Sequence, residues 1–313
     1  MSFKPDSPHL LLTLSAVFWA GTIVFSKNII ESLPPFTLSL GRFSTALIVL
    51  LPWMLKKGSF SALKDRQLLV RLVLLGFFGV FLFNSFLYMG LRHTSAINAT
   101  LINSLNPVLV ALLSVVWLKD KITHRQIIGL IISVSGILWI ESHGKLNNIV
   151  NIQFNPGDVF ILIAAFFWAY YSNLAKLVMQ KIPAMEAAAL ALFTGVIFLI
   201  PVSIVELHFT SSIDLGWETI ITVLYLGIFS SFVALYFWFY GIDKLGGARA
   251  ANYYNLIPFF GIIMAVIFLG EKVYPFQLVG GALILAGVYY SSRSKKAAPE
   301  PLKSVSVKKI TES

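Results

Sequence analysis

The chain has 313 residues, of which 57% are apolar and only 12% are charged, whereas soluble globular proteins carry roughly 25% charged residues. So few charges cannot cover the surface of a water-soluble protein of this length. The apolar residues form runs of about 20 residues, and a helix of that length crosses the ~30 Å hydrocarbon core of a bilayer. The absence of cysteine excludes disulfides, zinc-thiolate sites and iron–sulfur clusters. The sequence therefore predicts an all-α integral membrane protein.

The apolar runs predict ten transmembrane helices. Their expected limits are residues 9–31, 35–55, 68–92, 95–118, 125–142, 157–180, 184–206, 217–241, 247–270 and 275–292. No small-residue cleavage site follows the first run, so we expect this helix to stay as an anchor. Residues 293–313 are rich in Lys, Ser and Pro, which is typical of a disordered, solvated tail.

The basic residues indicate how the spans are oriented. With both termini on the cytoplasmic side, 18 of the 24 Lys and Arg residues fall on that side. Three fall on the outer side, Arg92, Lys145 and Lys272, and three lie inside spans, Lys27, Arg42 and Lys176. Because short cytoplasmic loops are enriched in basic residues, the sequence predicts a multi-pass protein of the cell (inner) membrane with both termini and the basic tail in the cytoplasm. The net charge of +10 therefore needs no nucleic-acid partner.

The chain contains an internal repeat. A shift of 149 residues aligns Phe18-Trp19-Ala20 with Phe167-Trp168-Ala169. A shift of 151 aligns a series of small and proline residues: Gly76/Gly227, Gly90/Gly241, Ala99/Ala250, Pro107/Pro258, Gly129/Gly280 and Gly136/Gly287. The two repeats, residues 9–142 and 157–292, hold five spans each. Since five is odd, the second repeat enters the membrane from the opposite side, and such inverted repeats are frequent in secondary transporters.

Several motifs carry a family resemblance. They are the Phe-Trp-Ala triplets, Gly41-Arg42-Phe43, Asn106-Pro107 through Asp120-Lys121, and Ile257-Pro258 through Gly270-Glu271-Lys272. In these motifs the chain resembles the EamA family of the drug/metabolite transporter superfamily over about residues 9–292. The resemblance implies a ten-helix carrier that exports amino acids or other small metabolites. It also implies a central cavity lined by helices 1–4 and 6–9, with helices 5 and 10 peripheral.

Catalytic or proton-carrying groups are not expected near the middle of the membrane. All five histidines and the acids nearest to the spans fall in loops or at helix ends, and no nucleotide, metal or nucleophile motif is present. We therefore expect neither an enzyme nor a cofactor. The smaller drug exporters of the superfamily carry a mid-helix carboxylate, which this chain lacks. Facilitated or exchange transport is expected instead, or coupling through end-located acids such as Glu206 or Asp243.

Neutral polar and aromatic side chains recur at helical spacing within the spans and should face the bundle interior. The residues predicted to contact substrate are Trp19, Thr22, Arg42, Asn84, Tyr88, Asn103, Asn106, Trp168, Tyr171, Tyr236, Asn252 and Asn255. The alternative for each polar group is helix–helix hydrogen bonding, worth about 0.6 kcal/mol per contact.

Arg42 and two prolines have more specific interpretations. Arg42 lies about seven residues, roughly 10 Å, into the second span, where an unpaired arginine costs at least ~2.5 kcal/mol. It is expected to anchor a substrate carboxylate, or else to bond helix-end carbonyls or Glu31. Pro107 and Pro258 should kink the fourth and ninth helices, either passively or as hinges.

These features favour a secondary transporter, independent of ATP, that moves an amino acid or another small metabolite outward by alternating access. A multidrug or aromatic-cation exporter is the alternative within transport, because Trp and Tyr side chains bind cations. A membrane sensor or assembly subunit is the alternative from another class. The expected partners are the lipid bilayer and a small-molecule substrate, and oligomerisation is not required.

Overall fold

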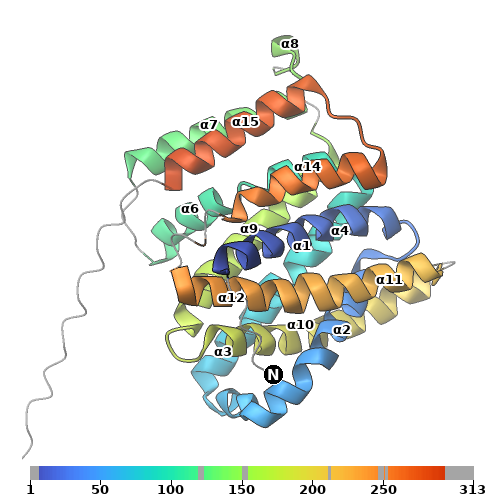
Figure 1. The fold of residues 1–313 in the computed structure, drawn as a ribbon, viewed down its shortest axis with the longest axis vertical. Helices are drawn as coiled ribbons and strands as arrows, with labels where there is room; N and C mark the ends of the chain where they lie inside the picture. Colours follow the sequence, from blue (N-terminus) through green and yellow to red (C-terminus); the bar gives the residue numbers. More distant parts are fainter. Residues whose placement is uncertain are drawn as a thin grey trace, which may run out of the picture.

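The computed structural model describes residues 7–118, 123–149, 154–210, 213–245, 250 and 253–292. These residues form a bundle of helices, and none of them belongs to a β-strand (Figure 1). Seven helices in the described chain are long and apolar enough to cross a membrane, and two shorter apolar helices, Leu256–Leu269 and Pro275–Ser291, accompany them. The expected basic tail, residues 293–313, lies outside the described residues.

The helices follow the predicted spans to within a few residues. The first half contains α1 (Pro8–Ile29), α2 (Pro35–Lys57), the short η1 (Ser59–Lys64), α3 (Arg66–Leu75), η2 (Gly76–Leu82), α4 (Phe83–His93), α5 (Ala96–Asn103), α6 (Asn106–Leu118) and α7 (His124–Glu141). The turn α8 (Leu146–Ile149) links it to the second half, which contains α9 (Pro156–Val178), α10 (Ala184–Phe209), α11 (Trp217–Tyr225), η3 (Leu226–Val233), α12 (Ala234–Leu245), α14 (Leu256–Leu269) and α15 (Pro275–Ser292). The first part of the predicted ninth span falls outside the described residues.

Local sequence signals set several helix ends. Ser7 caps α1, and Thr123 and Gln126 form a reciprocal capping box at the start of α7, which satisfies backbone donors that have no partner inside the helix. Gly58 ends α2 with φ of 70° and Gly270 ends α14 with φ of 63°. Both adopt the left-handed conformation that glycine reaches without steric cost.

Two of the long helices are π-helical at their centres. α3, η2 and α4 form one continuous helix, as do α11, η3 and α12, and both η2 and η3 are π-helical. The repeat aligns Gly76, the first residue of η2, with Gly227 in η3. Segments of π-helix are rare and occur frequently at functional sites, so their equivalent positions in the two halves point to the region between them.

The helices are interrupted where prolines were expected to kink them. α5 ends at Asn103 and α6 begins at Asn106, so that Pro107 is the second residue of the new helix. α14 begins two residues before Pro258. The interruptions are confirmed, and a hinge role for either proline stays a prediction.

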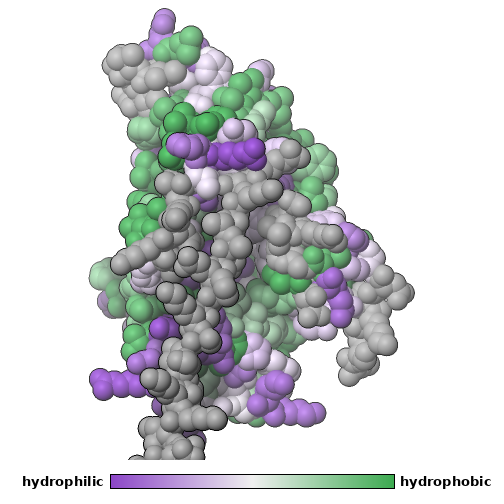
Figure 2. Space-filling model, turned by 90° about the vertical axis from the view of Figure 1, so that its left-hand side faces the viewer, coloured by the Kyte–Doolittle hydropathy of each residue, from purple (hydrophilic) through white to green (hydrophobic). Residues whose placement is uncertain are grey.

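The flanks of the bundle are apolar. Figure 2, which looks onto one end of the bundle, shows hydrophilic side chains at that end and apolar side chains on the flanks. Several large apolar side chains are exposed, among them Ile48, Val116 and Phe209. A soluble protein rarely exposes so much contiguous apolar surface, whereas lipid-facing helices require it.

α7 and α15 pack side by side along one edge of the bundle (Figure 1). An added Cβ on Gly129 would collide with the carbonyl of Gly287, and one on Gly136 would collide with the carbonyl of Gly280. The repeat aligns Gly129 with Gly280 and Gly136 with Gly287. The residues that the repeat aligns with Gly129 and Gly287 are thus Gly280 and Gly136, the pair that makes the second contact.

A second pair of close glycine contacts, deeper in the bundle, is related by the repeat in the same way. Gly76 packs against the backbone carbonyl of Ala191, and Gly227 packs against the backbone carbonyl of Arg42. The repeat aligns Gly76 with Gly227 and Ala191 with Arg42. Equivalent residues in the two halves thus make equivalent close contacts.

Replacing Gly136 with Ala is expected to destabilise the protein by about 1–3 kcal/mol, because the new methyl group overpacks the α7–α15 contact. Thermal unfolding in detergent measures this as a lower melting temperature. Ser135→Ala, one residue away on an exposed position, is the matched control and should leave the melting temperature unchanged. Equal melting temperatures for Gly136→Ala and the unmodified protein would contradict the packing described above.

Candidate functional site

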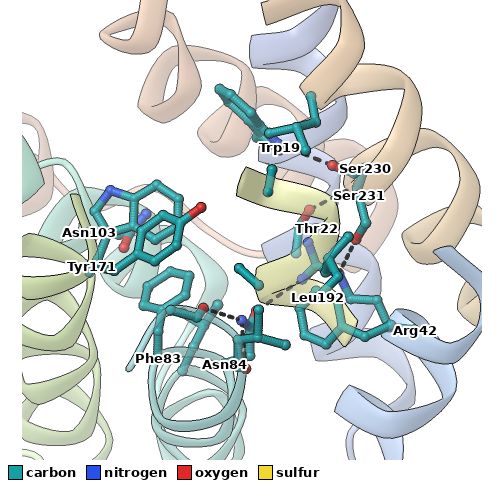
Figure 3. Close-up of a pocket in the computed structure, with 18 of the residues that line it drawn as sticks. Trp19, Thr22, Arg42, Phe83, Asn84, Asn103, Tyr171, Leu192, Ser230 and Ser231 are labelled. Carbon is teal, nitrogen blue, oxygen red and sulfur yellow. Dashed lines mark hydrogen bonds between the residues drawn. The ribbon is translucent and has the colours of Figure 1, made fainter. Parts of the chain in front are cut away.

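A partly open cavity lies among the helices of the bundle (Figure 3), and the empty space within it and at its open side together is about 870 Å³. Its lining side chains come from α1, α2, η2, α4, α5, α9, α10, η3, α12 and α14, together with Tyr254 just before α14. These are the helices that the family resemblance implies. None of the lining residues in the described chain comes from α7 or α15, so the outer helix pair takes no part in the cavity wall.

Most of the predicted contact residues meet at this cavity. Its lining includes Trp19, Thr22, Arg42, Asn84, Asn103, Trp168 and Tyr171. Tyr88 and Asn106 lie one layer behind and bond to lining residues. The substrate contacts expected of all these residues stay predictions.

Three predicted residues are not placed at the cavity. Tyr236 is 41% exposed and is absent from the lining, so its expected position facing the interior is corrected. Asn255 lies directly before α14 and does not line the cavity either. Asn252 lies outside the described residues.

Arg42 is buried at one pole of the cavity, with only 7% of its surface exposed. Its Nε donates to Ser231 Oγ at 2.8 Å, and its Nη1 donates to Tyr88 OH at 2.9 Å and to Asn84 Oδ1 at 3.2 Å. The guanidinium carbon also lies 4.8 Å from the centre of the Phe43 ring. Every one of these partners is neutral.

This environment corrects the structural alternative for Arg42. Neither Glu31 nor a helix-end carbonyl bonds its side chain within the described residues, and no carboxylate there forms an ion pair with it. Nη2 makes no hydrogen bond in the same part of the chain. Among the described residues, neutral dipoles orient the guanidinium and no carboxylate offsets its positive charge. An anion bound in the cavity could therefore pair with this charge and accept a hydrogen bond from Nη2.

Asn84 connects Arg42 to the π-helix. Its Oδ1 accepts from Arg42, and its Nδ2 donates to the carbonyls of Gly79 and Val80, each at 3.1 Å. In the other half, Ser231 Oγ accepts from Arg42 and donates to the carbonyl of Leu226 at 2.9 Å. The bonds from Asn84 to Gly79 and from Ser231 to Leu226 each reach a carbonyl five residues earlier, inside a π-helical segment. The two segments and Arg42 therefore form one hydrogen-bonded unit.

A second set of hydrogen bonds ties α1 to η3. Trp19 Nε1 donates to the carbonyl of Ser230 at 3.1 Å, and Thr22 Oγ1 donates to Ser230 Oγ at 2.9 Å. Ser230 Oγ in turn donates to the carbonyl of Phe18 at 2.7 Å. These bonds hold the Trp19 ring against the cavity, where it lies 5.9 Å from the Tyr254 ring.

Asn103 and Asn106 flank the interruption of the fourth helix. Asn106 Nδ2 donates to Asn103 Oδ1 at 3.0 Å and contacts Tyr254 OH at 3.3 Å. Asn103 and Tyr254 are equivalent in the repeat, and both line the cavity. The irregular backbone before each proline therefore faces the same space from the two halves.

The cavity has a polar pole, formed by residues whose repeat partners are apolar. Arg42, Asn84 and Ser231 form the polar pole, and their repeat partners are the apolar Ala191, Leu235 and Val80. All six residues line the cavity. Phe83, Trp168 and Tyr171 add aromatic wall, with ring centres 4.8 Å apart for Phe83 and Trp168 and 5.1 Å apart for Trp168 and Tyr171. The cavity is thus shaped for an amphipathic molecule.

Comparison with known proteins places the chain in a family. The EamA-like transporter family matches residues 7–142 and 155–293. The chain belongs to this family. The resemblance found in the sequence motifs is confirmed, and the chain is a multi-pass membrane protein related to transporters.

Individual EamA relatives cover most of the chain. An uncharacterized transporter of Archaeoglobus fulgidus is 32% identical over 91% of this chain and 96% of its own. A probable terminal-alkyne amino-acid exporter of Streptantibioticus cattleyicolor is 26% identical over 90% of this chain and 92% of its own. A solved crystal structure, 18% identical, covers 92% of this chain and 97% of its own with a TM-score of 0.61, which shows a shared fold.

Sequence reasoning missed Ser230 and Ser231 in this EamA protein. Their repeat partners, Gly79 and Val80, carry no polar group, so the repeat gave no signal. Nor does helical spacing from Tyr236 point to them, because they lie inside the π-helical η3. The position of two adjacent serines in the middle of an apolar span was the available clue.

Replacing Asn84 with Leu, the residue of its repeat partner, is expected to lower the free energy of unfolding by about 1–3 kcal/mol, because buried carbonyls and Arg42 lose a partner. Thermal unfolding in detergent measures the change. The double variant Arg42→Met/Asn84→Leu should lose less than the sum of the two single variants, since the two side chains share a hydrogen bond. Strictly additive losses would contradict a coupled pair.

Proposed function

We propose that this EamA protein is a secondary transporter that exports a small amphipathic metabolite carrying a carboxylate, most simply an amino acid. The observation that carries the proposal is the uncompensated charge of Arg42 at the polar pole of the cavity. The name of the Streptantibioticus cattleyicolor relative, a probable amino-acid exporter, supports the substrate class and the direction.

The charge of the cavity favours an anionic group. Among the residues that line it in the described chain, Arg42 is the one with a formal charge, and none is Asp or Glu. A carboxylate bound to a guanidinium by two parallel hydrogen bonds gains both charge and geometry. Elsewhere the cavity lining includes Ala191, Leu235 and aromatic rings, which suit an apolar side chain.

The same charge argues against the aromatic-cation exporter. The rings of Trp19, Trp168 and Tyr171 would attract a cation by a contact worth about 0.5–2 kcal/mol. A cation there would also meet the positive charge of Arg42 with no carboxylate to offset it. A zwitterionic amino acid avoids this repulsion because its carboxylate can lie at the polar pole.

Ten spans in two inverted halves fit the way the helix ends meet. At one end, Glu271 accepts hydrogen bonds from the backbone of Ala96 and Ile97 at the start of α5, and Asp214 N bonds to the carbonyl of Ser32. All of these residues fall at outer ends in the predicted topology.

At the other end, Lys181 pairs with Asp65 at 3.2 Å, and both are cytoplasmic in the predicted topology. The Leu68 N–H and the Lys181 ammonium hold the pKa of the exposed Asp65 carboxyl below its usual value. Together with the exchangeable glycine contacts, these pairings support alternating access between two similar halves around the central cavity.

The predicted orientation can be tested with single cysteines, since the natural chain has none. In intact cells, Asn147→Cys and Leu215→Cys should react with a membrane-impermeant maleimide. Ser61→Cys should react only after permeabilisation, because the positive-inside rule places it in the cytoplasm. The reverse labelling pattern would overturn the orientation.

Arg42→Gln is expected to weaken the apparent affinity for a carboxylate substrate by about 10- to 100-fold, because a hydrogen bond to a charged group is worth about 1.5–3 kcal/mol. Arg42→Lys should recover part of it, as an ammonium lacks the bidentate fork. Uptake and efflux of labelled amino acids in proteoliposomes give the measurement.

Lys176→Gln is the control, because Lys176 also lies in a predicted span but not at the cavity. The apparent affinity of this variant for the substrate should match that of the unmodified protein. Equal transport of a neutral amine analogue and the amino acid would contradict the role of Arg42.

A further inference from the structure

Two carboxyl groups meet away from the central cavity. Glu141 is the last residue of α7, and Asp158 lies in the first turn of α9. Glu141 accepts a hydrogen bond from the backbone N–H of Asn155, which caps α9 three residues before Asp158, so the two carboxyl groups lie close together. Neither residue has an acidic repeat partner, since Ser292 and His9 occupy the equivalent positions, so the pair is a feature of one end of the bundle.

The pair is enclosed by polar donors. Asp158 is only 4% exposed and accepts hydrogen bonds from Thr94 Oγ1 and, at 3.2 Å, from Asn98 Nδ2. Glu141 Oε2 accepts from the backbone N–H of Asn155 at 3.2 Å. The remaining oxygen, Glu141 Oε1, is fully buried and has no hydrogen-bond partner among the described residues.

Within the described residues, no cation forms an ion pair with either carboxyl. The neighbouring open pocket, which Asn98 and Asn155 also line, contains these charged and titratable groups: Lys27, Arg92, His93, His143, Glu271, Lys272 and Tyr274. None of these forms an ion pair within 4.0 Å with Glu141 or Asp158 in the part of the chain that the structure describes. Lys27 Nζ and the Arg92 guanidinium are bonded to the carbonyls of Leu91 and Ile30.

Two carboxylates held close together at a largely enclosed site repel each other, which favours protonation of one of them. A proton on Glu141 Oε1, donated to Asp158, removes one charge and gives this buried oxygen a hydrogen-bond partner. Both oxygens of Asp158 already accept hydrogen bonds, from Thr94 and Asn98, whereas Glu141 Oε1 has no partner among the described residues, so the proton is placed on Glu141. Asn98 and Asn155 also line the open pocket, which gives the proton a way to water.

We propose that Glu141 and Asp158 hold one exchangeable proton between them and that this pair couples transport to a proton gradient. The coupling part rests on the proposed transport function. On release, the O–H bond of Glu141 breaks, the proton passes to water in the pocket, and the pair carries two negative charges until it is protonated again.

α5 connects the proton site to the cavity. Asn98, in the first turn of α5, bonds Asp158, and its Oδ1 accepts from Gln277 Nε2 of α15 at 2.7 Å. The last residue of α5, Asn103, lines the central cavity directly before the helix interruption. A second charge on the pair changes the hydrogen bonds of Asn98, and α5, bounded by irregular backbone at both ends, carries that change to the cavity.

Infrared spectroscopy of the full chain in lipid tests the proton directly, with no need to know the substrate. The natural protein should show a carboxylic-acid C=O band that disappears on titration to alkaline pH and shifts in D₂O. Glu141→Gln and Asp158→Asn should each lose it, because the remaining carboxyl no longer has a charged neighbour. Glu271→Gln and Asp65→Asn are matched controls that should keep it, since each of those carboxylates accepts two backbone hydrogen bonds and contacts no other carboxyl. A band that is absent from the natural protein, or retained in both variants of the pair, overturns the shared proton.

Proteoliposomes loaded with a pH-sensitive dye test the coupling. Labelled amino acids should drive proton movement and accumulate against their gradient when a pH gradient is imposed. Glu141→Gln should still exchange labelled for unlabelled amino acid but should lose the accumulation. Accumulation equal to that of the natural protein overturns the coupling. If the natural protein exchanges amino acids without moving protons, the coupling is overturned and the transport function stands. If it exchanges no amino acid in the panel, both the proposed substrate class and the coupling are overturned. The infrared result decides the proton site in either case.

Discussion

The buried charge of Arg42 is the constraint on which the centre of the bundle depends. An arginine at this depth is costly in a membrane, and the protein stabilises it with a serine, an asparagine and a tyrosine rather than with a carboxylate. Two of these partners also bond carbonyls within the π-helical segments. The irregular helix centres, the guanidinium and the cavity wall are therefore parts of one arrangement, and none of them can change alone without leaving a buried polar group unpaired.

The internal repeat gives the cavity its position, and the differences between the halves give it chemistry. Glycines that the repeat aligns make matching close contacts, Gly129 with Gly287 and Gly136 with Gly280. At the cavity the symmetry ends, because Arg42, Asn84 and Ser231 face partners without polar side chains. The lining of the cavity is therefore asymmetric, although the glycine contacts around it follow the repeat. The proton pair at Glu141 and Asp158 is a second asymmetric feature, at one end of the bundle.

The sequence predicted the helix limits, and seven of its twelve expected contact residues line the cavity, because apolar run length and helical spacing depend on local residues alone. It predicted that Asn84 and Tyr88 share a face, and both bond Arg42. It failed for Tyr236, which follows a π-helical segment. A π-helix has more residues per turn than an α-helix, so the face rotates and Leu235 lines the cavity instead.

Contacts between distant segments were also beyond reach. Ser231 lies 189 residues from Arg42, and no periodicity connects them. Glu141 lies at the end of α7 and Asp158 at the start of α9, and no pattern in the sequence indicates that their carboxyls lie close together.

The glycine contacts between α7 and α15 constrain how the molecule can move. Where a backbone carbonyl rests directly on a facing glycine, no side chain lies between the helices to change rotamer, and sliding by one residue would set a Cβ against the carbonyl. The contact between α7 and α15 therefore resists sliding of one helix along the other. If one half rocks against the other, the backbone must change conformation away from this contact. The interrupted helices before Pro107 and Pro258 and the two π-helical segments are the places where the backbone already departs from regular α-helical geometry.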